Sequence, residues 1–168
     1  MHNNFFHKLK VYYEDTDAEG VVYYANYLKF LERARTEALV TLGFNNKKIK
    51  EDFGSLIIVK SCNIDYKISA QLEDELSIRS FVKSVTKTSF FMNQFISRGE
   101  DLIAEAKVHL VFINKEGKPM KIPNSLFQDF KPYFCDTIKV SSIFLTTLSS
   151  CIIFFESITL VFTFRGLG

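Results

Sequence analysis

The residues best suited to chemistry lie around Asp17, shortly before a segment with the spacing of an amphipathic helix. The first backbone N–H groups of a helix lack partners within the helix and carry partial positive charge. A carbonyl group held there is polarised as its oxygen becomes negative. A carboxylate beside it can act as a nucleophile or as a general base on water. Taken alone, an aspartate before a helix is far more often a cap than a catalyst.

A long helix must position this carboxylate, and the sequence predicts it over residues 24–42. One apolar stripe with helical spacing is formed by Leu28, Leu31, Arg35, Ala38 and Leu42, with Tyr27, Phe30 and Ala34 beside it. Gly43 fits the left-handed residue that often ends a helix. A first strand is expected over residues 7–13. Residues 14–20 then form a turn, in which Gly20 can supply a positive φ.

Strands dominate the rest of the predicted domain. Residues 45–54 suit a short helix or loop, and residues 125–130 suit a brief closing helix. Four strand-like segments lie between them, at residues 56–66, 71–84, 88–97 and 102–112. The last one alternates apolar and polar side chains throughout, which is typical of an antiparallel strand with one solvent face. One helix can cover such a sheet only if the sheet curves around it, so we predict an α+β domain.

Composition favours one main globular domain without a nucleic-acid partner. The chain has 168 residues, of which 47% are apolar and 24% are charged, as is usual for soluble proteins. Its 21 basic and 19 acidic residues are spread along the chain, without the basic block that binding to a phosphate backbone needs. We therefore expect no nucleic acid among the partners.

The cysteines and the N-terminus favour the cytoplasm. Cys62, Cys135 and Cys151 are far apart and lack a metal-binding spacing, so we expect reduced, buried thiols. The first residues contain no apolar run long enough for a signal peptide. The sequence also has no zinc-hydrolase motif, phosphate-binding glycine loop or serine-hydrolase elbow. Any hydrolysis therefore depends on the carboxylate and the helix end, with no metal.

Residues 133–168 differ in composition from residues 1–132, which we expect to form the domain. Between residues 140 and 164 the only charge is Glu156. This length would span a bilayer core, but Glu156 and many Ser and Thr residues oppose insertion. Three interpretations stay open: an extra hairpin, an extension that is not part of the fold, and a segment that contacts the membrane.

A longer string around Asp17 carries a family resemblance. Residues 13–27 read YEDTDAEGVVYYANY, and the helix continues with Phe30, Leu31, Glu32, Ala34 and Arg35. This string resembles the signature of the hotdog-fold acyl-CoA thioesterases. Within them it is most similar to the Tol-Pal-associated acyl-CoA thioesterase group of the 4-hydroxybenzoyl-CoA thioesterase superfamily. The resemblance extends over residues 6–131, which is most of the chain.

The resemblance implies a hotdog fold, in which a curved antiparallel sheet wraps a long central helix. In this family two subunits join their sheets, so a homodimer or a dimer of dimers is implied. The implied reaction hydrolyses the thioester of an acyl-CoA to a free carboxylic acid and CoA. The thioester lies at the subunit interface, and no cofactor is needed beyond the CoA of the substrate.

The resemblance also implies roles for individual residues. Asp17 falls on the catalytic aspartate, and Tyr24 falls on the helix start whose backbone amide polarises the thioester carbonyl. The implied substrate-binding residues are Tyr13, Gly20, Val21, Val22, Tyr23, Val59 and Lys60. Many members of the Tol-Pal-associated group carry His where this chain has Tyr24. A backbone role survives that change, whereas a histidine acid–base role does not, so the change bears on acyl-chain specificity.

A second reading keeps the fold but not the reaction. In it, a hotdog dimer holds acyl-CoA or acyl carrier protein without turnover, with or without attachment to the membrane through its tail. Asp17 distinguishes the two readings, because a pure binder has little use for an unpaired carboxylate beside a thioester. Glu32 and Arg35 are interpreted as a structural pair along the helix. His109 is expected to be solvated on the polar face of its strand.

Overall fold

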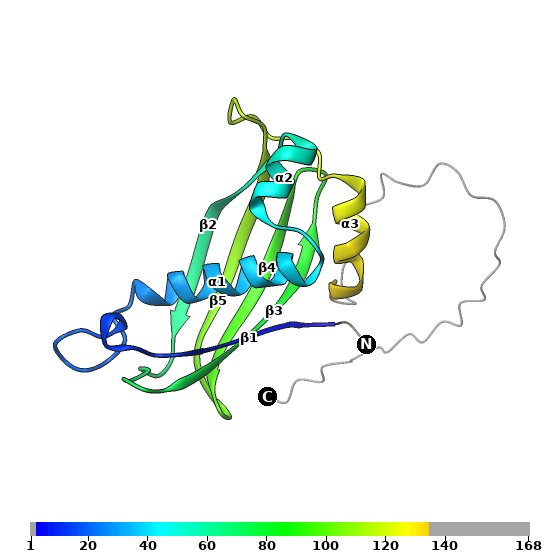
Figure 1. Cartoon of the computed structure of the whole chain (residues 1–168). Coiled ribbons are helices and arrows are strands. Elements are labelled where there is room, and N and C mark those ends of the chain that lie inside the picture. The colour runs from blue at the N-terminus through cyan, green and yellow to red at the C-terminus, as the bar shows by residue number, and fades with distance from the viewer. Residues whose placement is uncertain (1–2, 135–168) are drawn as a thin grey trace, which may run out of the picture.

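Five antiparallel strands form one sheet in the computed structural model, which describes residues 3–134 (Figure 1). The strand order is β1-β3-β4-β5-β2, so β1 and β2 form the two edges. The elements are β1 Phe5–Lys10, α1 Asn26–Thr41, α2 Asn46–Phe53, β2 Leu56–Tyr66, β3 Glu75–Val85, β4 Ser89–Arg98, β5 Asp101–Ile113 and α3 Asn124–Phe130. Helix α1 crosses one face of the sheet (Figure 1). This is the predicted α+β arrangement of a hotdog fold.

Helix α1 packs on the sheet mainly through the residues that its apolar spacing predicts, with two errors. Leu39, which the predicted stripe omits, is buried. The buried side chains are those of Tyr27, Phe30, Leu31, Ala34, Ala38 and Leu39. Leu28, predicted to lie on this stripe, is 44% exposed because it lies on the flank of the helix. The helix begins at Asn26 instead of residue 24, since the N–H of Asn26 closes a turn onto the carbonyl of Tyr23. Gly43 ends it with a φ of 79°.

The central strands follow the predicted alternation. On β5, the side chains of Ala104, Ala106, Val108, Leu110 and Phe112 are buried on the helix side. Strand β1 differs from its prediction, because it ends at Lys10 and a 3₁₀ turn follows at Tyr13–Asp15. The Asp15 carboxylate accepts the N–H of Tyr12 at 3.0 Å, which closes this turn and stops the strand.

Strand β2 is an edge with exposed side chains on both faces. Within residues 3–134 it pairs only with β5, and a bulge separates Val59 from Ser61. Ile58 and Val59 are 41% and 47% exposed although both are apolar. Cys62, predicted to be buried, is also exposed on this strand. The prediction failed because an edge strand has no neighbour to cover it. The other two cysteines lie outside the described residues.

The described chain ends against the core. Leu126 and Phe130 of α3 are buried, and the ring of Tyr133 stacks on Phe5 with 3.8 Å between ring centroids.

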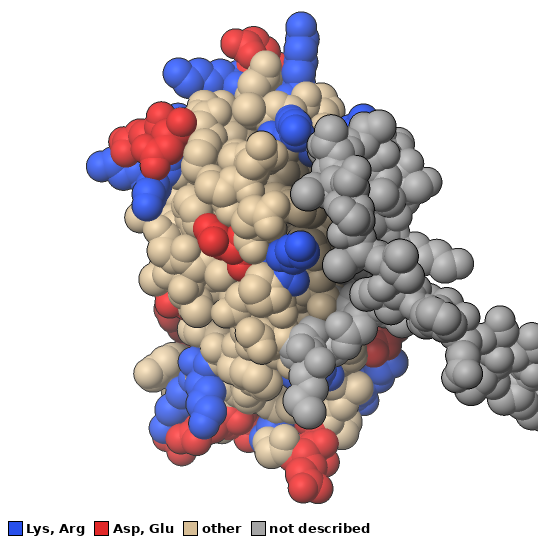
Figure 2. Space-filling model, turned by 90° about the vertical axis from the view of Figure 1, so that its right-hand side faces the viewer, with Lys and Arg blue, Asp and Glu red and all other residues tan. Residues whose placement is uncertain are grey.

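Figure 2 shows one side of the molecule, on which charged side chains gather at the upper and lower ends. Among residues 3–134, no helix is both long and apolar enough to cross a membrane. The predictions for the tail fall on residues outside the described part from residue 135 onward.

Candidate active site

Asp17 lies at the corner of a closed loop that leads into α1. Its N–H donates to the carbonyl of Val21 at 2.9 Å, and its own carbonyl accepts the N–H of Gly20 at 3.0 Å. Gly20 has the predicted positive φ, of 75°. Thr16 and Val22 form an antiparallel bridge that closes the loop behind them. The sequence therefore holds the aspartate by backbone contacts, which leaves its side chain available.

The Asp17 carboxylate is exposed and only partly engaged. One oxygen, Oδ1, accepts the N–H of Glu19 at 3.0 Å. This short-range bond is typical of an aspartate in a turn and fixes the direction of the side chain. Within the described chain no Lys or Arg forms an ion pair with Asp17. The second oxygen is therefore free to act on a bound group.

The start of α1 is tied to the same loop. The backbone carbonyl of Asp15 accepts both the N–H of Tyr23 and the Nδ2–H of Asn26, each at 2.9 Å. Asn26 is buried, so its bond anchors the first helical residue to the loop. The N–H groups of Tyr24 and Ala25 have no acceptor within residues 3–134. The positive end of the helix thus stays open beside the loop that carries Asp17.

Exposed tyrosines surround this end of the helix. Tyr13 is 81% exposed, and the rings of Tyr23 and Tyr24 lie 4.6 Å apart between centroids. The hydroxyl of Tyr24 raises the pKa of Tyr23, and the Asp17 carboxylate adds to this rise. Asp17 therefore lies within electrostatic reach of the Tyr23 hydroxyl. Tyr66, at the end of β2, donates its hydroxyl hydrogen to the carbonyl of Tyr24 at 3.0 Å.

The other predicted substrate-binding residues divide into three groups. Gly20 and Val21 belong to the exposed or half-buried side of the Asp17 loop. Val22 is 4% exposed, and its N–H donates to the carbonyl of Ala70, so its side chain belongs to the core. Val59 and Lys60 lie toward the opposite end of β2 from Tyr66. Within one subunit the fold does not bring them to Asp17.

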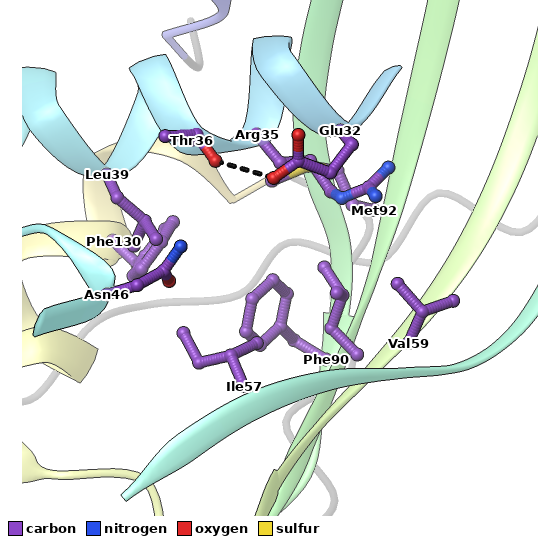
Figure 3. A pocket seen from close by; sticks show the side chains of 11 residues that line it. Glu32, Arg35, Thr36, Leu39, Asn46, Ile57, Val59, Phe90, Met92 and Phe130 are labelled. Carbon is purple, nitrogen blue, oxygen red and sulfur yellow. Dashed lines mark hydrogen bonds between the residues drawn. The ribbon is translucent and has the colours of Figure 1, made fainter. Parts of the chain in front are cut away.

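Val59 instead lines a pocket between α1 and the sheet, next to β2 (Figure 3). The pocket has a volume of about 100 Å³. Its walls are mainly apolar and come from Leu39, Ile57, Val59, Phe90, Met92, Leu110 and Phe130. Glu32, Arg35 and Thr36 of α1 add polar groups along one side.

Arg35 does not form the predicted structural pair with Glu32. The Nη1–H of Arg35 donates to Oε1 of Gln94 at 2.9 Å, whereas Glu32 accepts the hydroxyl of Thr36 at 2.9 Å. Gln94 is fully buried and donates in turn to the carbonyl of Leu31. Burial lowers the pKa of Arg35. The buried amide of Gln94 on β4 offers the guanidinium a fixed acceptor, which periodicity on the helix alone does not reveal.

His109 lies on the polar face of β5, as predicted, but it is packed there. Its ring stacks on Phe91 with 4.1 Å between centroids, and its Nε2 lies 3.0 Å from the Ser89 hydroxyl. Burial, and then the charge of Lys60, lower the pKa of His109. It is on the face of the sheet opposite to α1 and therefore away from Asp17.

A long helix wrapped by a curved five-stranded antiparallel sheet, with an acidic loop at the helix start, defines the hotdog class. The chain belongs to the thioesterase-like superfamily, whose model matches residues 11–130. This match confirms the fold and the family that the string around Asp17 indicated.

Individual relatives agree with this assignment. The chain is 37% identical over 127 residues to the acyl-CoA thioesterase YbgC of Haemophilus influenzae, covering 75% of this chain and 93% of that protein. It is 38% identical over 125 residues to the acyl-CoA thioester hydrolase YbgC of Escherichia coli O6:H1, covering 73% and 92%. The crystal structure of a probable thioesterase from Bartonella henselae is 36% identical and superposes with a TM-score of 0.70. That match covers 72% of this chain and 100% of the other.

Proposed function

We propose that this protein hydrolyses the thioester of an acyl-CoA to a free carboxylic acid and CoA. The observation that carries the proposal is the exposed Asp17 carboxylate, held at a loop corner beside the open N–H groups of Tyr24 and Ala25. The relatives from Haemophilus influenzae and Escherichia coli, both named for this activity, support it.

The proposed reaction uses only groups of the protein. The thioester oxygen accepts hydrogen bonds from the helix start at Tyr24, which stabilise the negative charge of the tetrahedral intermediate. Asp17 either takes a proton from the attacking water or attacks the carbonyl carbon itself and forms an anhydride that water then cleaves. In both routes the C–S bond breaks, and CoA leaves as a thiolate that takes up a proton. No cofactor is required.

We also propose a homodimer joined through β2. Within residues 3–134 this strand is a sheet edge, and its outer backbone groups have no strand partner there, so they are available to pair with a second copy. Antiparallel pairing of two β2 strands sets the Tyr66 end of one beside the Leu56 end of the other. Val59 and Lys60 of one subunit then approach the Asp17 loop of its partner, which accounts for their predicted role in substrate binding. A dimer of dimers would keep this site unchanged.

The apolar pocket beside β2 is the proposed place for the acyl chain. Phe90, Met92 and Leu110 form its floor, and such walls favour hydrocarbon over water. Glu32, on its side, is eight residues beyond Tyr24, which corresponds to about 12 Å along the helix at roughly 1.5 Å per residue. A chain that starts at the helix end therefore reaches the pocket after several carbon atoms.

The test is a hydrolysis assay over acyl-CoA substrates of increasing length, with wild type, Asp17→Asn and Asp52→Asn. Asp52 is an exposed aspartate on α2 and serves as the matched control. We expect Asp17→Asn to lower kcat by about 100-fold or more, as loss of a general base or nucleophile does. Equal rates for Asp17→Asn and wild type would refute the catalytic role. Tight binding without turnover would instead support a dimer that holds acyl-CoA or acyl carrier protein.

A cytoplasmic location is part of the same proposal. The support is sequence-based, namely the absence of metal or disulfide spacing among the cysteines and the charges near residue 10. Fractionation of cells that express the full chain tests this location. Recovery of the protein with membranes would favour contact through residues 133–168.

A further inference from the structure

The hydroxyl group of Tyr66 is the sole hydrogen-bond donor to the carbonyl of Tyr24 within residues 3–134, at 3.0 Å. In a regular helix this carbonyl would accept the N–H of Leu28, four residues further on. Here the N–H of Leu28 bonds to the carbonyl of Ala25 at 3.2 Å instead. One side chain from β2 therefore holds a backbone group at the start of α1, 42 residues away in the sequence.

The bonded carbonyl shares a peptide group with an open N–H. The carbonyl of Tyr24 and the N–H of Ala25 belong to one planar trans peptide, so they point in opposite directions. Fixing the carbonyl therefore fixes the direction of the N–H, which has no acceptor in the described chain. A hydrogen bond to the carbonyl also polarises the amide and strengthens its N–H as a donor.

The Tyr66 ring is 45% exposed, but it packs on one side against a buried ring. It packs edge-on against Tyr27, with 5.3 Å between ring centroids. Tyr27 is 3% exposed, and its hydroxyl oxygen accepts the N–H of Ala70 at 3.0 Å. Burial raises the pKa of Tyr66, so its hydroxyl group stays protonated and able to donate at neutral pH. The contact with Tyr27 therefore restrains the ring that carries the donor to the Tyr24 carbonyl.

We propose that Tyr66 is a positioning residue for thioester hydrolysis. It holds the Tyr24–Ala25 peptide so that the N–H of Ala25, together with that of Tyr24, meets the thioester oxygen as charge develops on it. This inference depends on the proposed hydrolase function. It adds a residue that lies outside the string around Asp17 and that belongs to the strand proposed to join two subunits.

The test compares the full chain with Tyr66→Phe, which removes only the hydroxyl group. Tyr133→Phe is the matched control, because its ring stacks on Phe5 and its hydroxyl makes no hydrogen bond within residues 3–134. For Tyr66→Phe we expect kcat to fall about 3- to 10-fold, the usual effect of one neutral hydrogen bond, with KM within about twofold. Tyr133→Phe should keep the wild-type kcat.

A second measurement separates positioning from damage to the fold. In ¹⁵N–¹H spectra, the amide resonance of Ala25 should move in Tyr66→Phe, since its peptide loses polarisation, while resonances of the central sheet stay in place. Sedimentation shows whether the assembly is unchanged. An unchanged kcat, or a loss of activity that is explained by KM or by dissociation of subunits, would overturn the role of Tyr66.

If Asp17→Asn is inactive while Tyr66→Phe matches wild type, only this inference fails. If Asp17→Asn is fully active, the proposed mechanism fails instead.

Discussion

The two ends of α1 are built in opposite ways. At the C-terminal end, the N–H groups of Leu42, Gly43 and Phe44 bond back to carbonyls of the last turn, and Gly43 has a left-handed φ. At the N-terminal end, the N–H groups of Tyr24 and Ala25 have no acceptor among the described residues. A helix end that only stabilises the fold satisfies its backbone groups. The open end is therefore the one to which we assign chemistry.

The two halves of the helix also differ in what surrounds them. The first turn is next to a carboxylate and exposed tyrosines, whereas residues 32–39 border an apolar pocket. We infer a division in which the N-terminal end acts on the thioester and the C-terminal half contacts the acyl chain. Variants in the two regions should therefore change different kinetic quantities.

After Asp17→Asn, the largest expected change is in the pocket. Leu39→Trp fills much of the space beside Phe90 and Leu110, so we expect kcat/KM for long acyl chains to fall about 10- to 100-fold, with short chains nearly unaffected. Val40→Trp is the control, since its side chain is exposed on the other side of α1. Assays over acyl-CoA lengths measure the effect, and sedimentation confirms that both variants keep their assembly. A uniform loss at every length would contradict the assignment of the pocket.

A smaller change is expected for Asn26, which anchors the open end. Asn26→Ala removes the buried bond from Nδ2 to the carbonyl of Asp15, which should cost about 1 to 3 kcal/mol of unfolding free energy. The helix start also loses its anchor to the Asp17 loop, so kcat should fall several-fold at every acyl length. Thr41→Ala removes the exposed bond to the carbonyl of Glu37 at the other end and should keep kcat. Urea titration and steady-state kinetics test both variants. A change in chain-length preference in Asn26→Ala would contradict the proposed division between the two halves of α1.

The contrast between the ends explains what the sequence could predict. The period of two along β5 and the helical spacing from Tyr27 to Leu39 depend on burial alone, so both elements were predicted within a few residues. Asp17 and the helix start could be proposed as the site because they lie together in one string. Tyr66 has no such signal, because its role depends on where β2 crosses the end of α1. The bond from Arg35 to Gln94 joins two elements in the same way and was missed for the same reason.

The smallest expected effects come from substituting two glycines, one near each end of α1. Gly20 in the Asp17 loop and Gly43 after α1 have φ values of 75° and 79°, and an added Cβ meets no atom within 4 Å at either position. Alanine should therefore cost both sites the same strain of about 1 kcal/mol, since only the positive φ opposes it.

The kinetic outcomes of the two substitutions should differ. Gly20→Ala shifts the loop that holds Asp17 and lowers kcat about threefold, a cost of roughly 0.7 kcal/mol at the transition state. Gly43→Ala should lower the melting temperature equally and leave kcat at the wild-type value. If both variants keep kcat, the loop tolerates movement, and precise placement of Asp17 is not what the open end provides.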